Sequence, residues 1–157
     1  MIDKNKKILM LVESPHKTKK IQHILRDAGY NVTVIASVGH IANIKDNKAS
    51  YKNTGIYPDQ DFKIDYAVTN DKKELLNSLA AQVKAADYIY LATDPDREGE
   101  QISWSLIKFL KIKEYKRVVM HEITPKAVLY AFEHPTTLNT NLVEAAQARD
   151  ALDKLLG

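Results

Sequence analysis

Three acidic residues, Asp94, Asp96 and Glu98, occupy alternate positions directly after an apolar run, and carboxylates spaced in this way can bind a metal ion. The apolar run, 88–92, predicts a buried strand that ends in this acidic turn. Carboxylates placed so close together repel one another, and a divalent cation with oxygen ligands offsets that repulsion. The residues therefore predict a magnesium site at the end of a strand.

A solvated acidic turn would carry the same charges and bind nothing, so the setting of the turn decides between the two interpretations. Arg97 and Gly99 lie within the turn, and an apolar pattern of helical spacing follows through Ile102, Leu106 and Leu110. A strand, a turn with glycine and a helix are the surroundings of many phosphate and metal sites. This setting favours the magnesium site.

A second group of residues is predicted to face the acidic turn. The run 7–12 is continuously apolar, which is typical of a parallel strand covered on both faces, and Glu13 follows it. Lys17 comes one helical turn later, and His40 follows a second predicted strand at 31–37. Because ligands bind beyond the carboxyl ends of parallel strands, we expect carboxylates and an ammonium group around a phosphate, as phosphoryl transfer requires.

The elements that position these residues are predicted from apolar periodicity and from capping residues. Strands are expected at 7–12, 31–37, 64–68, 88–92 and 117–120, and helices at about 15–28, 70–83, 97–110, 124–132 and 141–155. Ser14 and Thr124 are expected to cap helices at their start, Asn70 or Asp71 a third, and Gly29 the end of the first. The polar stretch 43–65 is expected to be an irregular connection. Alternating strands and helices predict an α/β fold with a mostly parallel sheet and helices on both faces.

The composition excludes several classes of protein. The 157 residues include no cysteine, which excludes a disulfide framework, a thiolate metal site and a cysteine nucleophile. No apolar run reaches the length of a membrane span, and the first residues do not resemble a signal peptide. The formal charge of +3 is too small to indicate nucleic-acid binding by itself, although lysines cluster in the first twenty residues.

Five blocks of the sequence, in order, resemble the type IA DNA topoisomerases of the bacterial topoisomerase I kind. The blocks are 11–17 (LVESPHK), 37–41 (SVGHI), 91–101 (LATDPDREGEQ), 121–124 (HEIT) and 147–153 (QARDALD). The resemblance implies a Rossmann-like Toprim domain, of a type shared with primases and some nucleases, over residues 1–135. It also implies that 136–157 is the first helix of the next domain, here truncated.

The resemblance further implies roles for individual residues. Asp94, Asp96 and Glu98, with Glu13 beside them, would hold Mg²⁺; Glu13 would take part in proton transfer at a 3′ hydroxyl, and Lys17 would contact the scissile phosphate. The residues expected to contact DNA are Lys17, His40, Arg97, Arg117, Arg149 and Asp153. Each has a structural alternative: a hydrogen-bonded turn for His40, a strand-flanking position for Arg117, and an ion pair between Arg149 and Asp153 on one helix face.

Type IA enzymes cleave one DNA strand through a tyrosine in a motif ending Tyr-x-Arg-Thr-Asp-Ser. Tyr115-Lys116-Arg117 matches only its first three positions. We therefore expect the chain to be the Mg²⁺- and phosphate-binding part of such an isomerase, inactive without the rest of the polypeptide. The expected partners are single-stranded DNA, or duplex with single-stranded regions, and the remaining domains, in a cytoplasmic, nucleoid-associated monomer with no membrane contact.

Two other functions are compatible with the sequence. The same carboxylates would serve a self-contained Toprim nuclease or a primase-like nucleotidyl transferase that uses two metal ions. A noncatalytic DNA-binding module with a structural acidic turn is the third possibility.

Overall fold

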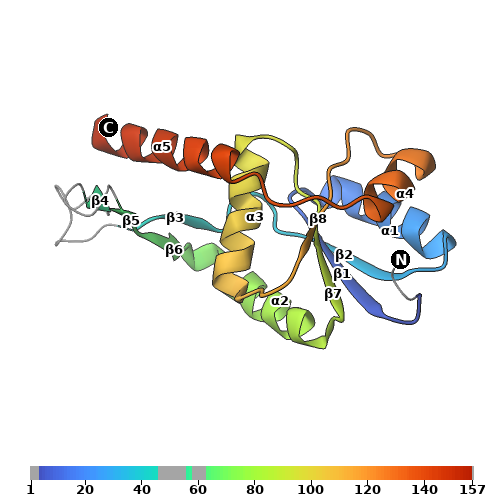
Figure 1. Cartoon of the computed structure of the whole chain (residues 1–157). Helices are drawn as coiled ribbons and strands as arrows, with labels where there is room; N and C mark the ends of the chain where they lie inside the picture. Colours follow the sequence, from blue (N-terminus) through green and yellow to red (C-terminus); the bar gives the residue numbers. More distant parts are fainter. Residues whose placement is uncertain (1–3, 46–55, 58–62, 157) are drawn as a thin grey trace.

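A parallel four-stranded sheet forms the centre of the computed structural model, which describes residues 4–45, 56–57 and 63–156 (Figure 1). Its strands, in spatial order, are β2 (Asn31–Ala36), β1 (Lys7–Val12), β7 (Tyr88–Leu91) and β8 (Lys116–Arg117). All three pairings are parallel, with Leu11 opposite both Ile35 and Leu91. The carboxyl ends of β1 and β7, where the acidic turn and Glu13 begin, therefore lie next to each other.

Helices cover both faces of the sheet, as the sequence predicts. Helices α1 (Thr18–Asp27) and α4 (Pro125–Glu133) pack on one face, and α2 (Lys73–Ala85) and α3 (Arg97–Leu110) pack on the other. Alternate residues of β1 supply the two cores: Ile8, Met10 and Val12 enter the first, and Leu9 and Leu11 enter the second. A continuously apolar strand is thus explained by burial on both sides.

The helix starts agree with most of the predicted caps. Ser14 accepts the backbone N–H of His16, but the turn it caps is the 3₁₀ helix η1 (Pro15–Lys17), so α1 begins only at Thr18. Thr124 accepts the N–H of Ala127 at the start of α4. The prediction for α2 was wrong, because neither the side chain of Asn70 nor that of Asp71 caps a helix there. Those residues form the 3₁₀ helix η4 (Asn70–Lys72) instead.

The stretch predicted to be irregular contains short antiparallel strands. β3 (Ala42–Ile44) pairs with β6 (Tyr66–Val68), and β4 (Ile56–Tyr57) pairs with β5 (Lys63–Ile64). Residues 46–55 and 58–62 of this stretch lie outside the described part of the chain. The β3–β6 ribbon projects away from the sheet beyond α3 (Figure 1).

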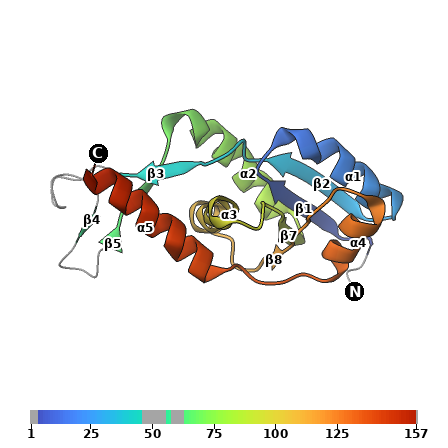
Figure 2. The same ribbon diagram turned by 90° about the horizontal axis from the view of Figure 1, so that it is seen from above.

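The last helix, α5 (Thr140–Leu156), packs against α3 and extends toward the same side as the ribbon (Figure 2). Val143 and Ala146 are its buried residues, and Asp150 bonds to the hydroxyl of Tyr66 on the ribbon. No helix in the described residues is long and apolar enough to cross a membrane. The predicted boundary at 135/136 stays a prediction.

Candidate functional site

Glu13 and Asp94 meet at the carboxyl edge of the sheet. An oxygen of the Glu13 carboxylate, Oε1, accepts the backbone N–H of Asp94 at 2.6 Å. Burial raises the pKa of Glu13, and the nearby carboxylates of Asp94 and Asp96 raise it further, although the N–H of Asp94 opposes the shift. Negative charge is therefore concentrated where β1 and β7 end.

Lys17 reaches the same point from η1. Its ammonium group lies 3.3 Å from Oδ1 of Asp94, and about half of each side chain is exposed (46% and 43%). An ion pair so accessible to water contributes little to stability. The ammonium group is thus available to a competing anion, which suits the predicted contact with a phosphate.

The other two acidic residues of the turn have separate protein partners. The Asp96 carboxylate accepts the backbone N–H of Gly99 at 2.7 Å and so caps α3 at its start. The Glu98 carboxylate contacts Nε2 of His40, which follows β2. The structure therefore brings Glu13, Lys17 and His40 to the acidic turn.

The turn itself is packed tightly against the first turn of α3. Thr93 is buried, and its hydroxyl bonds to the carbonyl of Gly99 at 2.6 Å and to the hydroxyl of Ser103 at 2.7 Å. A Cβ atom on Gly99 would lie only 1.9 Å from the carbonyl oxygen of Asp94. Only glycine allows this approach, which explains its place in the turn.

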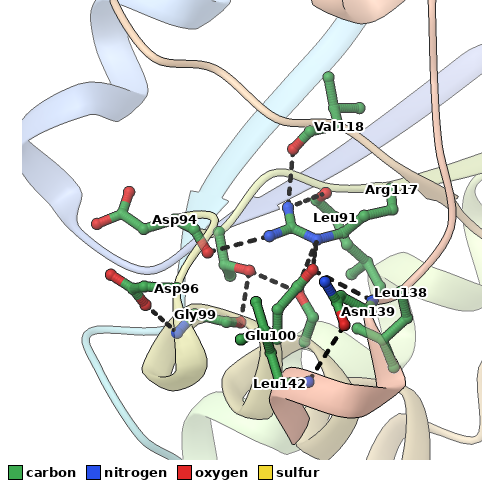
Figure 3. Close-up of polar contacts among 12 residues, drawn as sticks. Leu91, Asp94, Asp96, Gly99, Glu100, Arg117, Val118, Leu138, Asn139 and Leu142 are labelled. Atoms are coloured by element: carbon green, nitrogen blue, oxygen red, sulfur yellow. Dashed lines mark hydrogen bonds and ion pairs between the residues drawn. The ribbon is translucent and has the colours of Figure 1, made fainter.

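Arg117 was predicted to contact DNA, but its side chain is fully buried beneath the acidic turn (Figure 3). The guanidinium group bonds to the Glu100 carboxylate at 2.8 Å and to the carbonyl of Asp94 at 3.0 Å. A side chain enclosed by protein acceptors cannot reach a strand bound at the surface, so this arrangement does not support the predicted contact. Arg117 directly precedes the apolar residues 118–120, but this position does not distinguish a buried arginine from one that flanks a strand in solvent.

The remaining predicted DNA contacts are exposed. Arg97 lies in the first turn of α3, and Arg149 and Asp153 lie on α5; these two do not pair with each other in the described structure. His40 and Asp153 both line a cleft of about 440 Å³ between α5 and the start of the ribbon. His40, one of the lining residues, also contacts Glu98 of the acidic turn.

The side chains at this edge suit a hard cation such as Mg²⁺, because four carboxylates supply only oxygen ligands. Burial is the main cause of the raised pKa of Glu13, and the nearby Asp94 and Asp96 carboxylates add to it, so a cation at this edge would offset part of the shift. Among the residues that the structure describes, no three histidine or acidic side chains already surround one point suitable for a metal. The carboxylates of the acidic turn instead contact protein groups: Asp94 contacts Lys17, Glu98 contacts His40, and Asp96 accepts the N–H of Gly99.

Comparison with known proteins agrees with this arrangement. The Toprim domain family matches residues 8–123. The chain is 43% identical over 156 residues to DNA topoisomerase 1 of Rickettsia conorii, covering 95% of this chain and 19% of the relative. It is 40% identical over 157 residues to DNA topoisomerase 1 of Xylella fastidiosa strain Temecula1, covering 96% and 18%.

A solved structure shows the same likeness in three dimensions. Full-length topoisomerase I from Thermotoga maritima superimposes with a TM-score of 0.81 at 33% identity, covering 95% of this chain and 24% of that one. The chain thus spans about a fifth of the length of its curated relatives. Because the family match extends over most of its length, the chain belongs to the Toprim domain family and resembles the corresponding part of bacterial DNA topoisomerase I.

Proposed function

We propose that this chain is the Mg²⁺- and DNA-phosphate-binding Toprim part of a type IA DNA topoisomerase, an isomerase that relaxes DNA by transient cleavage, strand passage and religation of one strand. The main support is that Glu13 and Lys17, after β1, both contact Asp94, after β7. Oxygen ligands and a cation thereby share one edge of the sheet, as transfer of a phosphoryl group requires. The relatives named DNA topoisomerase 1 support the same assignment.

In this proposal Glu13, Asp94, Asp96 and Glu98 hold the magnesium ion. When bound, the ion supplies positive charge next to the phosphate. Burial raises the pKa of Glu13 most, and a bound cation would offset the further contribution from the Asp94 and Asp96 carboxylates. The cation would also compete with Lys17 for the Asp94 carboxylate. The ammonium group of Lys17 would then bind the phosphate, and Glu13 would exchange a proton with the 3′ oxygen of the cleaved strand.

The DNA strand would follow the cleft that His40 and Asp153 line, and the exposed Arg97 and Arg149 would contact it as well. Other domains of the polypeptide would supply the nucleophilic tyrosine, so the chain alone binds the metal and phosphate without cleaving DNA. Single-stranded DNA, or duplex with single-stranded regions, is the proposed substrate. We propose that the protein acts as a monomer associated with the cytoplasmic nucleoid.

Metal binding by the chain tests the first part of the proposal. Isothermal titration with MgCl₂ should give a saturable heat for the wild type and none for the Asp94→Ala/Asp96→Ala variant. Glu133→Ala/Glu144→Ala removes the same number of exposed charges from α4 and α5, and it should bind Mg²⁺ as the wild type does. Equal binding by the wild type and the Asp94/Asp96 variant would place the metal elsewhere.

Salt-dependent DNA binding tests the second part. Fluorescence anisotropy with a single-stranded oligonucleotide should show that Lys17→Ala weakens binding and lowers the slope of log K against log salt by about 0.7, the loss of one phosphate contact. Lys126→Ala removes an exposed lysine from the start of α4 and should leave both quantities unchanged. Identical slopes for Lys17→Ala and the wild type would contradict a phosphate contact.

A self-contained nuclease or nucleotidyl transferase remains the alternative, because all four acidic residues lie within this chain. Mg²⁺-dependent nicking of plasmid DNA by the isolated chain, lost in Asp94→Ala/Asp96→Ala, would favour that alternative. A noncatalytic module would instead bind DNA and show no thermal stabilisation by millimolar Mg²⁺.

A further inference from the structure

We propose that the buried Arg117–Glu100 ion pair is a positioning unit that fixes the geometry of the acidic turn and thereby sets its preference for Mg²⁺. This inference deepens the proposed function and rests on it. The exposed fractions of the two side chains are 0% for Arg117 and 4% for Glu100, and Nε of Arg117 lies 2.8 Å from Oε2 of Glu100. The pair therefore lies wholly inside the protein, directly beneath the candidate metal ligands.

The guanidinium group brings together three backbone carbonyls, two at the paired ends of β7 and β8 and one in the acidic turn. It donates to the carbonyl of Leu91 at the end of β7 at 3.1 Å, to Asp94 in the turn at 3.0 Å and to Val118 after β8 at 2.8 Å. Figure 3 shows the carbonyl of Asp94 directed toward Arg117, while the carboxylates of Asp94 and Asp96 point to the opposite side. Holding the carbonyl therefore fixes the backbone of Asp94, from which its carboxylate projects.

Glu100 extends the same support to α5. Besides Arg117, its carboxylate accepts the backbone N–H of Asn139 at 3.3 Å. The side chain of Asn139 in turn accepts the N–H of Leu142 at 3.1 Å, in the first turn of α5. One ion pair thus connects the acidic turn to the beginning of the helix that borders the cleft.

Stability alone does not explain this pair. A buried ion pair loses its hydration, and well-packed apolar side chains of similar volume are often equally stable or more stable. What apolar side chains lack is the set of directed donors, and lysine cannot replace them because its donors all sit on one nitrogen. Arginine is thus required for holding several carbonyls at fixed positions.

Mg²⁺ and Ca²⁺ carry the same charge but differ in the ligand geometry they require, so comparing them distinguishes an effect of geometry from an effect of charge. Mg²⁺ requires nearly ideal octahedral ligands, whereas Ca²⁺ accepts flexible and irregular ones. If Arg117 fixes the positions of the carboxylates, loosening the turn should weaken the binding of Mg²⁺ much more than the binding of Ca²⁺. If it acts through charge or through stability, both ions should be affected alike.

The test measures Mg²⁺ and Ca²⁺ dissociation constants by isothermal titration for the wild type and for Arg117→Lys, with circular dichroism to verify folding. We expect the Mg²⁺ constant of Arg117→Lys to rise about tenfold, as for other residues that support metal ligands, and the Ca²⁺ constant to change less than about twofold. Gln101→Met is the control. Gln101 is the equally buried neighbour of Glu100, but it bonds to Tyr66 and Asp150 instead of the turn, so the ratio of the two constants should not change.

Each outcome has one meaning. A wild-type chain that binds neither ion overturns the proposed function itself. A folded Arg117→Lys variant with an unchanged ratio, or with both affinities equally weakened, overturns the positioning role while the metal site stands. If Arg117→Lys does not fold, Glu100→Gln is measured instead. Because it changes the net charge, only the ratio of the constants is compared, and an unchanged ratio again contradicts the inference.

Discussion

The carboxylate of Glu13 accepts the backbone N–H of Asp94, at 2.6 Å, across 81 residues of sequence. The contact joins the carboxyl ends of β1 and β7, which pair in parallel along their length. It also places a carboxylate with a raised pKa beside two further acidic residues. This bond to the main chain of Asp94 therefore helps to hold the Glu13 carboxylate beside acidic groups that repel it.

Asp96 caps α3 and is a proposed Mg²⁺ ligand, and substitution can separate these two roles. Asp96→Asn keeps a good helix cap but removes the charge, so stability should stay near that of the wild type while Mg²⁺ binding weakens. Asp96→Ala loses the cap as well, and it should lower the free energy of unfolding by about 1 kcal/mol. Urea denaturation and magnesium titration of both variants measure the two effects. Equal stability of the two variants would show that the cap contributes nothing.

Gly99→Ala tests how tightly the turn packs. The new Cβ would meet the carbonyl oxygen of Asp94 at 1.9 Å, a backbone atom that cannot rotate away. Moving the turn should destabilise the protein by about 1–3 kcal/mol. This exceeds the stabilisation of about 1 kcal/mol expected from the higher helix propensity of alanine. Ser105→Ala, farther along α3, also places alanine at a buried position and should bind Mg²⁺ as the wild type does. Normal stability and metal binding in Gly99→Ala would mean that the turn is free to shift.

Local sequence rules were sufficient for the sheet and for the acidic turn. The apolar run in β1, the caps Ser14 and Thr124, and the left-handed Gly29, with a φ of +97°, all depend on residues within a few positions of one another. Parallel pairing then brings Glu13 and Asp94 together without further information. For these reasons the core of the candidate site is predictable from the sequence.

The parts that the sequence did not predict depend on distant partners. Arg117 looks like an exposed basic residue until Glu100 and the carbonyl of Asp94 are known to surround it. The strand β3 forms in a polar stretch because Tyr66 and its neighbours pair with it. Nothing local specifies either arrangement, because the free energy comes from contacts made only in the folded chain.

Val38 has a φ of +56°, a conformation that is strained for a branched side chain, and it is 55% exposed. The ammonium group of Lys72 bonds to its carbonyl at 2.8 Å, next to His40. Val38→Gly should relieve about 1–2 kcal/mol of strain, offset by about 0.5–1 kcal/mol of added entropy in the unfolded chain. Thermal unfolding should therefore show a small rise in Tm. Lys111→Gly, at the left-handed end of α3, provides the comparison and should behave similarly. A lower Tm for Val38→Gly but not for Lys111→Gly would mean that contacts of the valine side chain stabilise the protein by more than its backbone strain destabilises it.

Tyr66 connects the ribbon to α3 and α5 and gives a prediction at alkaline pH. Burial raises the pKa of its hydroxyl, and the carboxylate of Asp150 at 3.3 Å raises it further. In the unfolded chain the hydroxyl ionises near pH 10. Above that pH the unfolded state releases a proton that the folded state retains, so stability is lost as the pH rises.

Tyr66→Phe removes both the hydrogen bonds and this titration. At pH 8 the variant should be about 1 kcal/mol less stable than the wild type, because it lacks the hydroxyl whose hydrogen bonds join Tyr66 to Asp150 and Gln101. From pH 10 upward the difference should shrink, since only the wild type still loses stability through Tyr66. Urea denaturation at pH 8 and pH 10.5 measures the difference, and Tyr130→Phe, at a tyrosine that is 64% exposed, should match the wild type at both. A difference that stays constant with pH would show that the ionisation of Tyr66 is not linked to folding.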